Sequence, residues 1–369
     1  MTLRLPRKRV LFLLPNLGGG GAERVMVMLL HHLDRSRFEP HLALLEAVGP
    51  YLEELPADVP LHDLKAKRVR RAFPGMIRLA WKLRPHAILS TLCEMNMAAV
   101  LSRPFLPPGI RLLIREGASP SAQYVQGSKH PWVWKRLYRL LYPRANRIIC
   151  VGDFVADDLA VHFRIPRRKL ARIYNPVDIE WERKLANATG NPYQGSGPHL
   201  VAAGRLSKEK GLDILLEAMP RVRAAFPQAQ LTILGEGELM PDLVARREQL
   251  GLREAVHLIG FQQNPYPYLK HADLAVLPSR FDAMPVVVIE ALAVGTPVVA
   301  SDCPGAAREI LRDCPIARLV RPSDPLALAE AIVSVLSSTN KELGLDIRLE
   351  AYLSRFEVKA RVRDYEELF

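Results

Sequence analysis

The sequence predicts an α/β protein made of two doubly wound domains. Short apolar runs alternate with longer segments whose apolar residues recur at helical spacing, the pattern of parallel sheets covered by helices on both faces. This pattern runs twice, and the turn-rich stretch Asn187–Pro198 interrupts it. At 369 residues, the chain is also about twice as long as a typical domain. We therefore expect a first domain over residues 1–180, a linker over 181–197 and a second domain over 198–351.

The predicted strands are short, mostly apolar runs. In the first domain they are Val10–Leu14, His41–Leu45, Ala87–Leu89, Arg111–Ile114 and Arg147–Val151. In the second domain they are Leu200–Ala203, Gln230–Leu234, Val256–Leu258, Leu274–Leu277, Pro297–Ala300 and Ala317–Val320. Helical patterns include Ala22–His32, Gly211–Ala224, Leu239–Gln249 and the tail Tyr352–Phe369. Because ligands of doubly wound sheets bind beyond the carboxyl ends of the strands, the loops that follow these strands are the candidate sites.

Positive charge is concentrated in the first half of the chain. The whole sequence has 51 Lys and Arg against 39 Asp and Glu, a net charge of +12, and its 49% of hydrophobic residues excludes a largely disordered chain. Residues 1–180 hold 29 basic and 15 acidic residues, a net of +14, whereas residues 181–369 hold 22 and 24, a net of −2. We therefore expect an anionic partner for the first domain.

Two basic stretches carry much of this charge. They are Lys65–Arg71 with Arg78, Lys82 and Arg84, and Lys129–Arg144 with its aromatic residues Trp132, Trp134, Tyr138 and Tyr142. Cations beside interfacial aromatic residues suit the headgroup layer of an anionic membrane. A solvated helix with a few core aromatic residues is the alternative. No nucleic-acid-binding module accompanies the charge, so we expect no nucleic-acid partner.

The cysteines and the apolar runs favour a cytoplasmic protein. The four cysteines are scattered, form no CxxC pair and are expected to be reduced and structural. They are Cys93, Cys150, Cys303 and Cys314. No apolar run approaches the roughly 18–20 residues that span a membrane. The basic start before Val10–Leu14 imitates an export signal only faintly, because no cleavage pattern follows it.

The first site motif is Gly204–Gly211, which reads Gly-Arg-Leu-Ser-Lys-Glu-Lys-Gly, follows a predicted strand and opens a helix. Gly204 lets the chain turn sharply, so that Arg205 and Lys210 stand near a helix N-terminus, whose backbone N–H groups also attract anions. Two cations beside a helix end predict a diphosphate site. A solvated charged loop is the alternative.

Two acidic residues, Asp282 and Glu290, lie eight positions apart around a strand-to-helix transition. The run after Pro285 is apolar, so Glu290 is expected in a buried helix. A buried carboxylate needs hydrogen-bond donors, and two vicinal hydroxyls, such as those of a ribose, would supply them. Asp282 and the N–H groups of Ala283 and Met284 are expected at the helix start, which suits hydroxyls and phosphate. An N-cap and an internal ion pair are the alternative roles.

These motifs, in this order, resemble the family-4 retaining glycosyltransferases of the GT-B architecture. The resemblance rests on Gly-Arg-Leu-x-x-x-Lys-Gly from Gly204, on Leu234–Gly237, on Gly260-Phe261 and on the acid-x7-Glu pattern that continues as Glu-Ala-Leu-Ala-x-Gly-x-Pro-Val-Val from Glu290. Tyr174–Asp178 is similar to the family's signature before its interdomain linker. The resemblance implies two Rossmann-like domains that face a cleft, an acceptor domain and a donor domain, with the last helix, residues 352–369, returning to the first.

The resemblance also implies roles in donor binding. Arg205 and Lys210 would hold the donor diphosphate, and Glu290 would bind the ribose hydroxyls. The backbone near Phe261 and Gln262 would contact the base. No Asp-x-Asp metal motif occurs, so we expect a metal-independent enzyme without a cofactor.

Asp282 departs from the family pattern. It takes the place of the first Glu of the family's Glu-x7-Glu, which contacts the donor sugar. Asp is one methylene shorter than Glu, a loss of reach of roughly 1.5 Å. Ala283 and Met284 replace the family's Gly-containing turn. We expect the contact with the sugar hydroxyls to differ accordingly.

Glycines follow the first strand of the first domain. Glycine permits close backbone approach to a ligand. The resemblance implies that Gly19, Gly20 and Gly21 border the donor phosphates and the acceptor. Glu23, in the first helical turn, is expected to cap the helix and to interact with its dipole.

Polar residues after other strands of the first domain are further candidates. Glu116 is expected either near the reacting centre or paired with Arg115. Many family members carry a His in this stretch, where this chain has Gly117. Glu94 and Asn96 are further candidates at the same edge of the sheet.

The predicted function is transfer of a sugar from a nucleotide diphosphate sugar to a hydroxyl of a glycan or lipid-linked acceptor, with retained configuration. The resemblance implies a UDP-linked donor, with a GDP-linked donor as the alternative. It also implies a hexosyltransferase and a role in polysaccharide or glycoconjugate synthesis at the inner face of the cytoplasmic membrane. An inactive sugar-nucleotide-binding subunit is one alternative. A nucleotide-sugar epimerase of the same architecture is the other.

Overall fold

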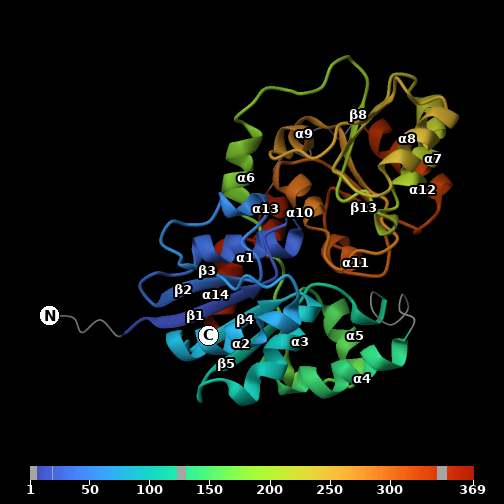
Figure 1. Ribbon diagram of the computed structural model, residues 1–369. Coiled ribbons are helices and arrows are strands. Elements are labelled where there is room, and N and C mark those ends of the chain that lie inside the picture. The colour runs from blue at the N-terminus through green and yellow to red at the C-terminus, as the bar shows by residue number, and fades with distance from the viewer. Residues whose placement is uncertain (1–5, 19, 123–129, 339–346) are drawn as a thin grey trace. The chain divides into compact units, whose positions relative to one another are not determined.

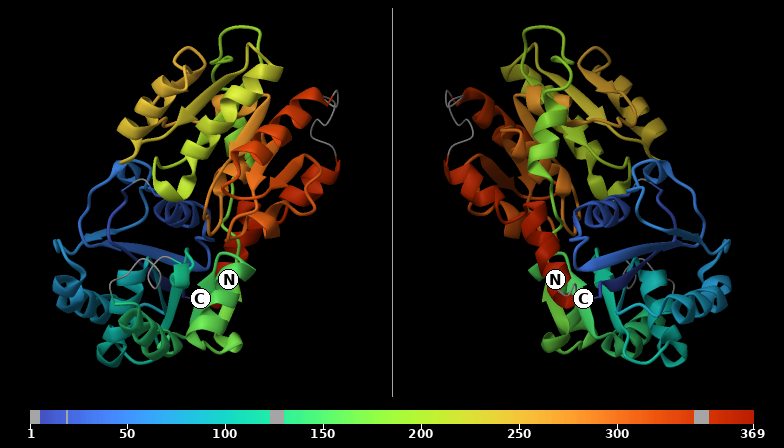
Figure 2. Two further views of the ribbon diagram at one scale, coloured as in Figure 1. Left: turned by 90° about the vertical axis from the view of Figure 1, so that its right-hand side faces the viewer. Right: turned by 90° about the vertical axis from the view of Figure 1, so that its left-hand side faces the viewer.

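The computed structural model forms two compact units and describes residues 6–18, 20–122, 130–338 and 347–369. Unit 1 comprises residues 1–176 and 358–369, and unit 2 comprises residues 177–357. Each unit contains one parallel sheet with helices on both faces (Figures 1 and 2). The predicted α/β class, with two doubly wound sheets, is therefore confirmed.

The unit 1 sheet has the strand order β3-β2-β1-β4-β5-β6-β7 and is parallel throughout. Its strands are β1 (Lys8–Leu14), β2 (Phe38–Leu44), β3 (Leu61–Asp63), β4 (Ala87–Thr91), β5 (Arg111–Glu116), β6 (Arg147–Cys150) and β7 (Leu170–Arg172). All five predicted strands are present. The two edge strands, β3 and β7, were not predicted because each has three residues and no buried side chain.

The unit 1 helices are α1 (Gly21–His32), α2 (Val69–Leu83), α3 (Cys93–Ser102), α4 (Pro131–Leu141), α5 (Asp153–Phe163) and α14 (Val358–Leu368). In α1, buried apolar residues recur every three or four positions, which turns one face toward the sheet. The chain end packs into the same core, where Phe369 lies edge to face against Phe12 and Phe38.

The unit 2 sheet is also parallel, with the order β10-β9-β8-β11-β12-β13. Its strands are β8 (His199–Ala203), β9 (Gln230–Leu234), β10 (Val256–Leu258), β11 (Leu274–Leu277), β12 (Val298–Ser301) and β13 (Ala317–Val320), all at predicted positions. The helices are α6 (Ile179–Ala186), α7 (Leu212–Ala225), α8 (Met240–Gln249), α9 (Tyr266–His271), α10 (Val286–Ala293), α11 (Ala307–Leu311), α12 (Pro325–Ser337) and α13 (Ile347–Leu353).

Two expected boundaries differ from the structure. The stretch 181–197, expected as a linker, belongs to unit 2, and its first residues are helical because Asp178 caps α6 by accepting a 3.0 Å hydrogen bond from Trp181 N. The tail 352–369, expected as one helix, is divided between α13 and α14. The break coincides with the passage from unit 2 to unit 1 after Glu357.

In both sheets the strand order reverses beside the first strand. The reversal lies between β1 and β4 in unit 1, and between β8 and β11 in unit 2. Loops that leave the carboxyl ends of two such strands diverge to opposite faces and open a crevice. None of the described helices is long and apolar enough to cross a bilayer.

Candidate functional site

The residues predicted for the second domain gather at one edge of the unit 2 sheet. The loop with Arg205 and Lys210 follows β8, and the loop with Asp282 follows β11. These two strands flank the reversal of strand order. Phe261 follows β10 at the same edge. Parallel pairing therefore brings together segments that are distant in the sequence, as the motif positions predicted.

Lys210 and Asp282 form an ion pair, with Lys210 Nζ 2.6 Å from Asp282 Oδ2. Asp282 is buried, whereas about a quarter of the Lys210 side chain is exposed. Burial acts to lower the pKa of Lys210, but the charge of Asp282 and the hydrogen bond that Lys210 donates to it outweigh burial, and the pKa lies above its ordinary value. The ammonium group is therefore charged at neutral pH. The sequence interpretation assigned these residues separate ligands and missed the pair.

Arg205 is the second cation at this edge. Its side chain is exposed and makes no hydrogen bond or ion pair with any residue that the structure describes. Asp282 pairs with Lys210, so the exposed Arg205 remains in the same loop as a cation with no ion-pair partner among the described residues. This arrangement favours an anionic ligand.

Two glycines let the loops of this edge touch. Gly211 has a φ of +63°, and a Cβ built on it would lie 2.2 Å from the carbonyl oxygen of Pro278. Gly305, with a φ of +137°, would place a Cβ 1.7 Å from the carbonyl oxygen of Asp282. Any side chain would force these segments apart. Gly305 was not among the predicted site residues, although glycine after a strand is a signal that could have found it.

The helix expected to begin at Asp282 begins later. Helix α10 starts at Val286, and Ala283 and Met284 are buried in the loop before it. Pro285 explains the difference, because a proline disfavours the helical conformation in the residue before it. Asp282 instead pairs with Gly305 in an isolated parallel bridge. The expected helix-start position of the N–H groups of Ala283 and Met284 is therefore wrong.

Glu290 and Phe261 have contrasting environments. Glu290 lies inside α10 and is buried, as predicted for a carboxylate in an apolar helix. Phe261 exposes about half of its surface (52%) although it is a large apolar side chain. The neighbouring Gln262 donates from its amide to the carbonyl oxygen of Ile259 at 3.0 Å. An exposed ring at this edge offers a surface on which a planar group can stack.

The glycine loop of unit 1 is partly described. Gly19 lies outside the described residues, Gly20 is the N-cap of α1 and Gly21 is its first residue. A Cβ built on Gly21 would meet no atom within 4 Å, and one on Gly20 would meet only the Glu23 side chain. The packing of the protein itself therefore does not require glycine at position 21.

Glu116 is enclosed within unit 1. Tyr142 donates to its Oε2 at 2.5 Å, and Tyr138 donates to the same oxygen at 3.3 Å. Burial raises the pKa of Glu116 to about 7 and outweighs the opposing effect of these hydrogen bonds. The two tyrosines, expected at a membrane surface, are fully buried. Tyr138 lies on the inward face of α4, and Tyr142 begins the 3₁₀ turn that follows this helix. That expectation is wrong for both.

Arg115 does not pair with Glu116. Successive side chains of a strand point to opposite faces, and the Arg115 guanidinium donates to Thr91 Oγ1 at 3.2 Å and to Asn175 Oδ1 at 2.5 Å. Asn96 is likewise buried and donates to the carbonyl oxygen of Arg115 at 2.9 Å. Of the further candidates, Glu94 alone is exposed.

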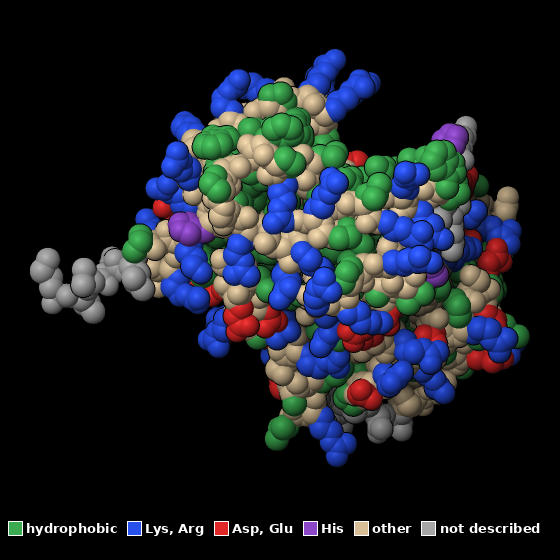
Figure 3. Space-filling view, turned by 90° about the horizontal axis from the view of Figure 1, so that it is seen from below, with side chains coloured by type: hydrophobic (Ala, Val, Ile, Leu, Met, Phe, Trp, Pro, Cys, Tyr) green, Lys and Arg blue, Asp and Glu red, His purple; other side chains and the backbone are tan. Residues whose placement is uncertain are grey.

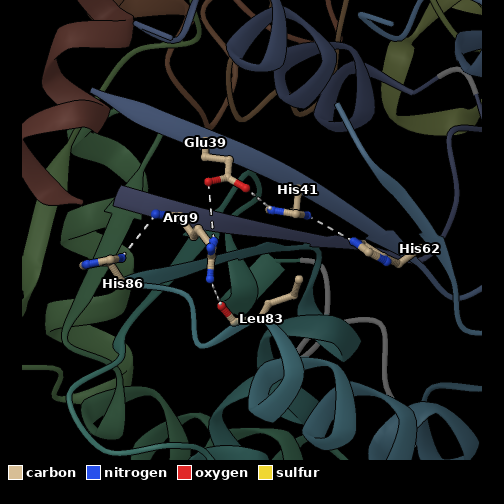
Figure 4. A network of polar contacts seen from close by, with 6 residues as sticks. All are labelled: Arg9, Glu39, His41, His62, Leu83 and His86. Carbon is tan, nitrogen blue, oxygen red and sulfur yellow. Dashed lines mark hydrogen bonds and ion pairs between the residues drawn. The ribbon is translucent and has the colours of Figure 1, made fainter. Parts of the chain in front are cut away.

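A separate polar network begins near the amino-terminal ends of β1, β2 and β4 and extends along β2 to His62 on β3 (Figure 4). His41 Nδ1 lies 3.2 Å from His62 Nε2, and His41 Nε2 lies 3.3 Å from Glu39 Oε1. Arg9 connects this group to the start of β4, because its backbone N–H donates to His86 Nδ1 at 3.2 Å. None of these residues was predicted as a site.

The described part of the chain offers no cluster of side chains suited to a metal ion, and it contains a cavity away from the predicted site. No group of three or more His, Cys, Asp and Glu side chains there is arranged to hold a metal ion. A cavity of about 340 Å³ opens at the amino-terminal ends of β8 and β9, lined by residues such as Gly197, Arg223 and Gln228. It contains none of the predicted site residues.

Two doubly wound sheets, with cations in the loop after β8 at the switch point of unit 2, are typical of the GT-B class of sugar-transferring enzymes. Family models agree with this class. The model described as "Glycosyltransferase Family 4" matches residues 19–181, and the model described as "Glycosyl transferases group 1" matches residues 197–338. Together they cover most of the chain. The chain belongs to the family-4 glycosyltransferases, and it is a glycosyltransferase.

Curated relatives carry related names. The chain is 29% identical over 360 residues to the N-acetylgalactosamine-N,N'-diacetylbacillosaminyl-diphospho-undecaprenol 4-alpha-N-acetylgalactosaminyltransferase of Campylobacter jejuni, which covers 95% of this chain and 94% of the relative. It is 32% identical over 240 residues to the phosphatidyl-myo-inositol mannosyltransferase of Mycobacterium tuberculosis, covering 62% of this chain and 58% of the relative.

Solved structures share the fold over nearly the whole chain. A glycosyltransferase from Rickettsia africae superposes with a TM-score of 0.81 at 17% identity and covers 98% of both chains. HepE of Anabaena, in complex with UDP, superposes with a TM-score of 0.77 at 19% identity and covers 97% of this chain and 98% of its own. At these identities the likeness establishes the fold.

Proposed function

We propose that this glycosyltransferase moves a sugar from a UDP-linked donor to a hydroxyl of a lipid-linked glycan, with retained configuration. The observation that carries the donor part is the cationic edge of unit 2, where Lys210 and Arg205 follow β8 at the reversal of strand order. Two findings support it. The Anabaena structure was solved with UDP, and the Campylobacter relative is named for a diphospho-undecaprenol acceptor.

The charges suit a leaving diphosphate. Arg205 is unpaired among the described residues, and Lys210 can exchange its bond to Asp282 for a phosphate oxygen. Both would stabilise the negative charge that develops as the bond between the sugar and the phosphate breaks. The acceptor oxygen would bond to the same face of the sugar carbon, and its proton would pass to the departing phosphate. Asp282, once released, would accept a hydrogen bond from a sugar hydroxyl.

Two other residues would hold the nucleoside. Glu290, buried in α10, would accept hydrogen bonds from the ribose hydroxyls, and the exposed ring of Phe261 lies at the edge where the base would stack. In unit 1, the loop at Gly20 and Gly21 would approach the donor phosphates, since no protein atom fills the space beside Gly21.

Substitution of the two cations tests the donor assignment. Each removes a charge-assisted contact of about 1.5–3 kcal/mol, so we expect Lys210→Ala and Arg205→Ala each to reduce turnover at least tenfold. Lys208→Ala is the matched control, because Lys208 is an exposed cation in the same loop. Wild-type turnover from both variants would exclude the diphosphate assignment. Interconversion of the donor sugar without acceptor would instead favour the epimerase.

We propose that unit 1 contacts the anionic lipids at the inner face of the cytoplasmic membrane. Helix α2 contains no acidic residue, and its exposed residues are mostly cations beside Trp81. These are Arg70, Arg71, Pro74, Arg78, Trp81 and Lys82. Figure 3 looks onto the side of unit 1 on which α2, α3 and α4 lie, and shows Lys and Arg side chains interspersed with apolar ones and fewer acids. On α4, Trp132 remains exposed (66%).

Flotation with liposomes tests the membrane contact separately. We expect the protein to float with vesicles that contain anionic lipid and to be released by salt, since the attraction between exposed charges is screened. Replacing Arg70, Arg71, Arg78 and Lys82 with Glu is expected to abolish flotation. No salt-sensitive binding by the wild-type protein would contradict the membrane contact and leave the donor assignment intact.

A further inference from the structure

A second ion pair, between Arg280 and Asp213, joins the same two segments as the Lys210–Asp282 pair. Arg280 Nη1 donates to Asp213 Oδ1 at 2.7 Å, and Nη2 donates to Asp213 Oδ2 at 2.6 Å. Asp213 is in the first turn of α7, after the loop that carries Lys210, and Arg280 is two residues before Asp282. The guanidinium thus joins the loop after β8 to the loop after β11.

The backbone strengthens the same junction. Arg280 Nη1 also donates to the carbonyl oxygen of Lys208 at 3.1 Å. The backbone N–H groups of Arg280 and Phe281 donate to the carbonyl oxygen of Glu209 at 2.8 Å and 3.3 Å. Lys208 and Glu209 form the short 3₁₀ turn that ends at Lys210. The two loops are therefore connected immediately before each member of the Lys210–Asp282 pair.

The Arg280–Asp213 pair is better suited to orientation than to stability. The side chains of Arg280 and Asp213 are 30% and 46% exposed, and ion pairs that reach solvent contribute little to the free energy of unfolding. The two parallel hydrogen bonds nevertheless hold the planar guanidinium in one orientation. Hydrogen bonding from Arg280 lowers the pKa of Asp213, so the carboxylate stays ionised at neutral pH.

The backbone of Asp282 is bonded to a third segment, which does not involve Arg280. The N–H of Asp282 donates to the carbonyl oxygen of Pro304 at 3.2 Å, and its carbonyl oxygen accepts from Ala306 N at 3.2 Å. Asp282 is thereby fixed to the loop after β12. The position of Lys210 relative to Asp282 then depends on the junction that Arg280 makes.

We propose that Arg280 is a positioning residue for the donor diphosphate. By binding Asp213 and Lys208 it holds the Lys210 loop against the Asp282 loop, so that the Lys210 ammonium is in place before the donor arrives. Arg280 acts through Lys210 and does not itself bind the donor. This inference rests on the proposed diphosphate site.

Nucleotide binding by the full chain tests this role, with UDP and GDP as probes in titration calorimetry. We expect Arg280→Met to weaken binding of the nucleotide that the wild-type protein binds by at least fivefold. Its melting temperature is expected to fall by no more than about 4 °C, because the pair is exposed. Arg280→Lys is expected to restore part of the affinity, since a lysine reaches the carboxylate without the two-point geometry. Arg221→Met is the matched control, because it breaks the exposed pair of Arg221 and Glu330 and leaves the site untouched.

A charge exchange separates positioning from folding. The double variant R280D/D213R keeps an ion pair between the two loops with its polarity reversed, and we expect it to bind more tightly than R280D alone. Affinity of Arg280→Met within twofold of wild type would overturn the proposal, as would equal losses in Arg280→Met and Arg221→Met. A wild-type protein that binds neither UDP nor GDP would overturn the proposed donor site itself, and this proposal with it.

Discussion

Replacing Glu116 with Gln should change how the stability of unit 1 depends on pH. Burial raises the pKa of this carboxyl from 4.5 to about 7, so the folded protein holds its proton more tightly than the unfolded chain does. The stability from Glu116 is therefore fully present below about pH 4.5 and is lost as the pH rises through about 7. The difference between these pKa values corresponds to about 3 kcal/mol of unfolding free energy.

Glutamine keeps the shape of the side chain and an acceptor for Tyr142, but it does not titrate. Between about pH 5 and about pH 8.5, the free energy of unfolding of the wild type should fall by about 2.5 kcal/mol relative to that of Glu116→Gln. For a unit of this size, this difference corresponds to roughly 5–10 °C in melting temperature. Calorimetric melting curves across this pH range measure it.

Glu94→Gln is the control, since Glu94 is an exposed carboxylate on α3 in the same unit. Its melting temperature should follow the wild type at every pH. Parallel pH dependences for wild type and Glu116→Gln would refute the reasoning, because they would mean that the buried carboxyl does not change its protonation between these pH values. If the two melting temperatures differed by the same amount at every pH, the difference would come from the amide group alone, and the prediction would still be refuted.

The other predictions concern two glycines and a histidine. Gly211→Ala should lower the melting temperature by several degrees, since the φ of +63° and the nearby Pro278 carbonyl oxygen oppose a side chain. Gly21→Ala should melt like the wild type yet bind the donor more weakly. Scanning calorimetry measures both melting temperatures and titration calorimetry the donor affinity, and an unchanged melting temperature for Gly211→Ala would contradict the first prediction. His62→Gln should lose less stability than the wild type on acidification from about pH 7.5 to 5. Burial, then the charges of His41 and Lys82, lower the pKa of His62 below 6.5, so its contribution is present above that pH and lost below it. Identical acid sensitivity would count against this assignment.

The fold, and the sheet edge at which the candidate site residues gather, could be predicted from local sequence. A strand such as β11 is a continuous apolar run, which is typical of a strand buried in a parallel sheet, so its position follows from composition. Parallel pairing then brings the loops after such strands to one edge, whatever the details of packing. Edge strands such as β3 could not be predicted, because an exposed three-residue segment has no apolar pattern.

Side-chain partners depended on tertiary structure. Lys210 and Asp282 lie 72 residues apart in the sequence, and Arg280 and Asp213 lie 67 apart, so no local pattern relates them. The orientation of α4 and of the 3₁₀ turn after it likewise decided that Tyr138 and Tyr142 donate hydrogen bonds to Glu116 in the interior, although in the sequence they are aromatic residues among cations. Local sequence determined the strands, the helices and the sheet edge where the cations gather, because apolar periodicity and the turns that glycine permits are set by residues a few positions apart. Charge pairing and burial were decided by the tertiary structure, since both depend on which distant segments the sheet brings into contact.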